Sequence, residues 1–166
     1  MRYLKLFESY DSIQSKVEMC FIDVTDMDIL IKYDGYSNTP KGGTTKEFIT
    51  LKINLDNRVT SIFNKKKSKL GVEYRPIENG VEIAFEISNA IQRCLGSNLD
   101  ITWAQVISIN GFPGKRVEKT FSKTGRTGEF DNPTGGYYNV NDLSDFIESK
   151  GDMLRTIEIH FTEWNI

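Results

Sequence analysis

The sequence predicts an α+β fold: a single domain, residues 1–166, whose mainly antiparallel sheet of roughly seven to nine strands carries two or three short helices on one face. Three observations support this prediction. Many segments alternate apolar and polar residues with the period of two that is typical of strands. Only two or three segments have helical spacing, and strands do not alternate regularly with long helices, as they do around parallel sheets. A chain of 166 residues is also long enough to bury one core without metals or disulfides.

The clearest strand lies near the C-terminus, at residues 155–162. Ile157, Ile159 and Phe161 alternate there with polar residues, so one face is expected to be buried and the other exposed to solvent. Residues 48–55 have the same alternation. Two further strands are predicted at 101–109, with Ile101, Trp103, Ile107 and Ile109 on one side, and at 116–121.

The N-terminal part is also predicted to be mostly strand. The run at 16–24 is almost continuously apolar, which favours a strand covered on both faces. It is expected to form a hairpin with residues 29–33. The remaining assignments are a short strand at 2–7, a polar connection at 8–15, and a loop at 34–46 that is rich in Gly, Asn, Thr and Pro.

The middle of the chain contains a hairpin signal. Asn79-Gly80 supplies the positive φ angles of a two-residue type I′ turn, so residues 72–77 and 81–87 are predicted to pair, with Pro76 at a sheet edge. Ser88 then caps a short helix at 89–95, which Gly96 ends. Residues 56–69 fit either a helix or a strand, and we favour the helix.

A helix is predicted near the C-terminus from Asn139, its N-cap, to Lys150. Tyr138 and Leu143 occupy the positions of a hydrophobic staple, and Gly151 follows as the C-terminal stop. The long Gly-rich segment at 122–136 precedes this helix. Loops of this length in compact domains are usually mobile or functional.

The sequence indicates a cytosolic protein. The apolar residues at the N-terminus are too few for a signal peptide, and the longest uncharged stretch, 101–114, contains Asn, Gly and Pro and cannot cross a bilayer. Cys20 and Cys94 lie far apart and have no metal-binding spacing, so we expect two buried, reduced thiols. No metal or cofactor is predicted.

Sequence motifs for catalysis are incomplete. Residues 111–116 resemble part of a phosphate-binding loop, but Ile109 stands where the first glycine is needed. Residues 35–37 begin like a nucleophile elbow, but Thr39 replaces its final glycine. The pairs Asp26/Asp28, Glu82/Glu86 and His160/Glu158 could serve a metal or acid–base chemistry, although each is explained more simply as solvated polar residues.

Charge is unevenly distributed along a chain whose net charge is only −2. Residues 127–166 carry eight carboxylates against two cations. Two basic clusters lie upstream of this acidic segment: Lys65, Lys66, Lys67 and Lys69 form the first, and Lys115, Arg116, Lys119, Lys123 and Arg126 form the second.

We therefore expect a non-enzymatic domain that binds and inhibits a protein partner. Small cytosolic inhibitors such as bacterial immunity proteins and antitoxins share this general character. The expected mechanism is occlusion of a basic active site, such as that of a nuclease toxin, by complementary charge. The carboxylates expected at this interface are Glu129, Asp131, Asp142, Asp145, Glu148 and Asp152.

Two other functions stay open. The basic clusters could bind nucleic acid or a nucleotide, with Phe112, Phe121 or Phe130 available for stacking, although a pI of about 5.5 is low for a nucleic-acid binder. A small enzyme could use His160 with Glu158, or Asp26 with Asp28. The oligomeric state is also open, because an edge strand near Pro76 could pair with another chain.

Overall fold

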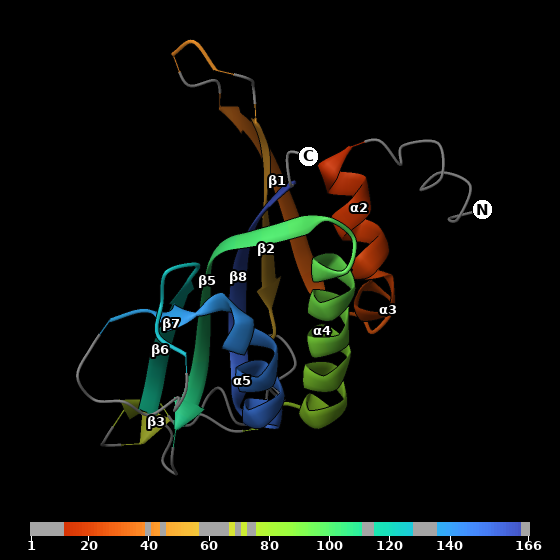
Figure 1. Ribbon diagram of the computed structural model, residues 1–166. Helices are drawn as coiled ribbons and strands as arrows, with labels where there is room; N and C mark the ends of the chain where they lie inside the picture. Colours follow the sequence, from red (N-terminus) through yellow and green to blue (C-terminus); the bar gives the residue numbers. More distant parts are fainter. Residues whose placement is uncertain are drawn as a thin grey trace.

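The computed structural model describes residues 12–38, 41–43, 46–56, 67–68, 71–72, 76–110, 115–127 and 136–163. These residues form an α+β fold in which helices pack on a six-stranded sheet (Figure 1). The strands of that sheet, in spatial order, are β1 (Leu30–Asn38), β2 (Lys46–Asn54), β8 (Leu154–Glu163), β5 (Leu99–Asn110), β6 (Lys115–Ser122) and β7 (Tyr138–Asn139).

The α+β class is confirmed, and two details of the predicted sheet are corrected. Among the described residues the main sheet has six strands, fewer than predicted, and it is mixed because β6 and β7 run parallel. Two short strands, β3 (Lys67–Ser68) and β4 (Gly71–Val72), form a separate pair. The strands predicted at 48–55, 101–109, 116–121 and 155–162 are β2, β5, β6 and β8.

Strand β8 lies at the centre of the sheet, between β2 and β5. Its buried residues Ile157 and Ile159 stand opposite Ile53 and Leu51 of β2, and all four side chains belong to the core. Arg155 is also fully buried, and its Nη1 donates to the backbone oxygen of Leu154 at 2.8 Å. The apolar alternation predicted for this strand therefore marks the face that packs on the helices.

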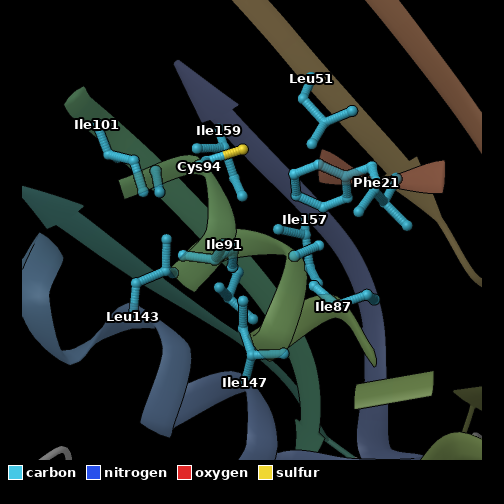
Figure 2. Packing of buried hydrophobic residues seen from close by; sticks show 14 of the residues in the cluster. Phe21, Leu51, Ile87, Ile91, Cys94, Ile101, Leu143, Ile147, Ile157 and Ile159 are labelled. Carbon is cyan, nitrogen blue, oxygen red and sulfur yellow. The ribbon is translucent and has the colours of Figure 1, made fainter. Parts of the chain in front are cut away.

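The helices cover one face of the sheet (Figure 1). They are α2 (Ile13–Cys20), α3 (Ile22–Thr25), α4 (Gly80–Leu95) and α5 (Leu143–Lys150), and two short 3₁₀ turns, η2 (Val140–Asp142) and η3 (Gly151–Met153), flank α5. The core lies between the two layers, and Figure 2 shows Ile87 and Ile91 of α4 packed with Ile147 of α5 and Ile157 of β8. On the opposite face of the sheet Leu30 and Lys32 are exposed.

The strand predicted at 16–24 is instead helical, so the hairpin with 29–33 is also wrong. Ile13, Val17, Phe21 and Val24 are buried and recur every three or four residues, which places them on one side of α2 and α3. Ser12 caps α2 by accepting a hydrogen bond from the Ser15 backbone N–H at 3.1 Å. The helical period was hidden by the extra apolar residues Met19 and Ile22.

The hairpin predicted across Asn79-Gly80 is wrong as well, because residues 81–87 belong to the long helix α4. Asn79 does adopt the predicted positive φ, at 55°, but it stands at the N-cap of the helix rather than in a two-residue turn. Ser88 lies buried in the middle of α4 and caps nothing. The predicted end of the helix is confirmed, since Gly96 follows the last helical residue.

Strand β5 contains an irregularity that divides the residues predicted to share one side. The pairing with β8 shifts between Ile101 and Trp103, and again between Ile107 and Ser108. Such bulges re-aim the side chains that follow. As a result Ile101 is fully buried in the core with Ala104 and Val106, whereas Trp103 lies beside His160 on the opposite face.

Strand β1 extends to Asn38 and takes up the first part of the loop predicted at 34–46. The assignment of 2–7, most of 56–69, and residues 128–135 of the predicted long loop lie outside the described residues. Over the described part of the chain, no helix is long and apolar enough to cross a membrane.

Candidate functional site

The C-terminal helical segment carries a row of carboxylates. Asn139 starts it as predicted, because its side-chain oxygen accepts a hydrogen bond from the Asn141 backbone N–H at 2.9 Å. Leu143, Phe146 and Ile147 are buried. Since these residues occupy the inner side of α5, Asp145 and Glu148 are exposed on its outer side.

Helix α4 runs antiparallel to α5 and packs against it (Figure 1). The hydroxyl oxygens of Ser88 and Ser144 lie 2.6 Å apart in the interface, and the Ser88 hydroxyl donates to Glu148 Oε2 at 3.4 Å. At the other end of the contact, a Cβ atom on Gly80 would lie 2.1 Å from the Cα of Asp152. Glycine therefore allows α4 to begin directly against η3. This contact fixes the position of α4 beside the carboxylates of α5 and η3.

Two large apolar side chains of α4 are exposed next to this row. Val81 is 71% exposed and Phe85 is 49% exposed. They lie one turn apart and so share one side of the helix. Val81 lies beside Gly151, with its Cγ2 3.3 Å from the position of a Cβ there, and Phe85 is one turn from Ser88, which contacts Glu148.

We call this region the acidic helical surface. It consists of Val81 and Phe85 together with the carboxylates of Glu78, Glu82, Glu86, Asp142, Asp145, Glu148 and Asp152. In residues 76–96 and 139–153 these seven carboxylates compare with two cations, Arg93 and Lys150. A strong negative field around exposed apolar side chains can attract a basic surface and then bury apolar area against it.

The structure brings together four of the six carboxylates that were predicted to bind a partner. Asp145 and Glu148 are exposed, and Asp142 and Asp152 are half-buried at the two ends of α5. Glu129 and Asp131 lie outside the described residues.

The second basic cluster is divided by strand geometry. Side chains alternate between the two faces of β6, so Lys115 and Lys119 point to one face and Arg116 to the other. Lys119 Nζ contacts the Tyr138 hydroxyl at 3.1 Å, and Lys123 forms an ion pair with Asp100. The backbone of Arg126 forms an isolated parallel β-bridge with Tyr138.

The first basic cluster falls largely outside the described part of the chain. Lys65, Lys66 and Lys69 are not described, and Lys67 is described only as part of the backbone of β3.

The three residue pairs considered for catalysis lie on different elements: β8, the turn after α3, and α4. His160 Nε2 lies 3.1 Å from Glu158 Oε1, and the His160 ring is 4.7 Å from the Trp103 ring. Asp26 and Asp28 lie in the turn that follows α3, and Glu82 and Glu86 lie one helical turn apart on α4. Among the described residues no group of three His, Cys, Asp or Glu side chains could hold a metal ion.

The structure also brings together Cys20 and Cys94, which the sequence placed far apart. Both thiols are free and buried, and each shifts the pKa of the other, that of Cys20 downward and that of Cys94 upward. Their closeness follows from the packing of α2 on α4, because each cysteine is buried on the inner side of its helix.

Val81 and Phe85 were not foreseen as surface residues, because residues 81–87 were predicted to form a strand, on which both would share a face with Ile83 and Ile87. The signal that could have found them is the helical spacing of Ile83, Ile87 and Ile91. Val81 and Phe85 fall outside that spacing.

No family model, no curated protein and no solved structure that was compared with this chain matches it.

Proposed function

We propose that this chain is a protein-binding, inhibitory domain whose acidic helical surface covers a basic site on a partner protein, such as the active site of a nuclease toxin. The observation that carries the proposal is the exposure of Val81 and Phe85 beside the carboxylates of α4 and α5. An immunity protein or antitoxin would neutralise its toxin in this way.

The proposal assigns different tasks to the two kinds of side chain. Carboxylates accelerate the encounter with a basic partner and align it, and they pair with the Lys and Arg side chains that a nuclease uses to bind phosphate. Phe85 provides the apolar anchor, because aromatic side chains near the centre of an interface often contribute much of its affinity. Glu82 and Glu148 lie on neighbouring helices near this anchor and are the best charges to test.

The test is affinity capture from lysate of the native host with three tagged proteins. They are the wild type, the double variant Glu82→Lys/Glu148→Lys, and the control Asp34→Lys/Glu118→Lys, which changes the same number of exposed carboxylates on β1 and β6. We expect the wild type and the control to retain one protein in stoichiometric amount. The double variant should retain at least about tenfold less, because each reversal replaces attraction by repulsion.

The captured protein must then be inhibited by the wild-type chain. Its activity, measured on nucleic acid if it is a nuclease, should fall as wild-type chain is added. The same amount of the double variant should leave that activity unchanged. Equal capture by all three proteins would reject the acidic helical surface as the interface. Nucleic acid recovered at low salt, without a stoichiometric protein, would favour the basic clusters instead.

A further inference from the structure

A cavity of about 650 Å³ opens where α2 meets the C-terminal end of α4. Met19 and Cys20 line it from α2, and Arg93 lines it from α4. Lys16, Gly96, Ser97 and Asn98 complete its wall. It is distinct from the acidic helical surface.

Cys20 lines this cavity, and Cys94 lies deeper in the core. Cys20 is 7% exposed and Cys94 is fully buried. Cys94 belongs to the same core cluster as Ile159 of β8, and both are labelled in Figure 2. A small reactant that enters the cavity therefore meets Cys20 before Cys94, and the two thiols are close enough for each to shift the pKa of the other.

Arg93 holds positive charge beside Cys20. Its Nε and Nη2 both donate to the Cys20 backbone oxygen, at 3.1 and 2.8 Å, which ties α4 to α2. Nη2 also lies 3.6 Å from Asp23, and Lys16 forms an ion pair with Glu163 of β8. In the described part of the chain Tyr33 of β1 also lies near the two thiols, and Glu18 of α2 lies near Tyr33.

These contacts make Cys20 the more acidic of the two thiols. Interaction with the Cys94 side chain lowers the pKa of Cys20 to about 7, against the opposing effect of burial, and Ser97 and Arg93 lower it further. The same interaction raises the pKa of Cys94, and burial adds to that increase. At neutral pH Cys20 is therefore partly a thiolate, the nucleophilic form of cysteine, and Cys94 is a thiol.

We infer that Cys20 and Cys94 form a peroxide-reactive dithiol site, in which Cys20 is oxidised first and Cys94 resolves it to a disulfide between α2 and α4. The Cys20 thiolate attacks hydrogen peroxide or an alkyl hydroperoxide. An S–O bond forms, the O–O bond breaks, and hydroxide or alkoxide leaves with the electron pair, so the sulfur is oxidised to a sulfenic acid and the peroxide is reduced.

The second step closes the disulfide. The Cys94 sulfur attacks the Cys20 sulfur, an S–S bond forms, the S–O bond breaks, and water leaves with the Cys94 proton. A dithiol reductant such as dithiothreitol reverses the product to the two thiols.

The experiment treats the full chain with one to a few equivalents of hydrogen peroxide near pH 7. In the wild type we expect the intact mass to fall by two hydrogen atoms, a Cys20–Cys94 cross-linked peptide after digestion, and reversal by dithiothreitol. In Cys94→Ser, a sulfenic acid should accumulate at Cys20 and react with dimedone. In Cys20→Ser, Cys94 should show no such product, because it is buried and remains a thiol.

The pH dependence supplies a second readout. In Cys94→Ser, which keeps a hydroxyl donor, the rate of Cys20 alkylation by iodoacetamide should rise with a midpoint near pH 7, below the usual cysteine value of about 8.5. Wild-type protein that keeps both thiols titratable after excess peroxide, or that forms only disulfides between chains, would overturn the proposal. These wild-type measurements decide the matter even if a cysteine variant fails to fold.

Discussion

Phe85 is half exposed on α4, although Ile83 and Ile87, two residues away on either side, are fully buried. On a strand all three would point to the same face. On a helix a separation of two residues is about 200°, so Phe85 turns outward when its neighbours face the core. Phe85, which completes the strand-like alternation of this segment, is thus the residue that remains on the surface.

Phe85→Ala should weaken binding of the captured partner without unfolding the chain. We expect Kd to rise by roughly 30-fold, equivalent to about 2 kcal/mol, as for aromatic anchors in other interfaces. The free energy of unfolding should change by less than about 0.5 kcal/mol, since the side chain is half exposed.

The matched control for Phe85→Ala is Leu30→Ala, which removes another exposed apolar side chain but on the opposite face of the sheet. Titration calorimetry and urea unfolding measure the two quantities. A Kd that is equal in both variants would exclude Phe85 as the anchor.

At the scale of elements, the close contact between the start of α4 and η3 positions the whole acidic helical surface. Ile77 supports it, because its backbone N–H donates to the Asp152 oxygen at 2.9 Å. Asn79, at a φ of 55°, turns the chain into the helix. A residue larger than glycine at position 80 would have to push α4 and η3 apart.

Gly80→Ala is therefore expected to destabilise the fold, by about 2 kcal/mol or more, because overpacking at a backbone contact forces the two elements to move. Urea unfolding measures the change. Gly96→Ala is the control at the other end of α4, since a Cβ there would lie 3.5 Å from the nearest atom, the Gln92 backbone oxygen. If the two variants had the same free energy of unfolding, η3 would be able to move away from α4 with little loss of stability.

At the scale of the whole molecule, the net charge of −2 conceals a strong local imbalance. The acidic helical surface occupies the helical layer, whereas the second basic cluster lies at β6 and the turn after it. An approaching basic protein would therefore be oriented by the field as well as attracted by it.

Association with the captured partner should slow as salt is added. Between about 0.05 and 0.5 M NaCl we expect the association rate constant to fall by at least tenfold, because the screening length shortens from about 14 to about 4 Å. The dissociation rate constant should change much less, since it depends on contacts that are already formed. Stopped-flow mixing measures both. A salt-independent association rate would mean that the carboxylates do not steer the encounter.

Much of the fold was predictable where one local pattern allows a single interpretation. Apolar and polar residues alternate over Ile49–Leu55 in β2 and Ile157–Thr162 in β8. Helix α5 has a capping Asn139 and a terminal Gly151 around an amphipathic segment. The acidic row at Asp145 and Glu148 followed directly from that helix. Prediction failed at 16–24 and 81–87, where apolar residues fit both periods.

Patterns within short segments were enough to specify the α+β class, the strands at the centre of the sheet, and the acidic character of the C-terminal helix. The helix at residues 80–95 depends instead on the complete fold, since burial of Ile83, Ile87 and Ile91 against the sheet outweighs the local alternation. The same packing exposes Phe85 one turn from Ser88, which contacts Glu148, and brings Cys20 close to Cys94. Those contacts connect distant segments, and no pattern within one segment specifies them.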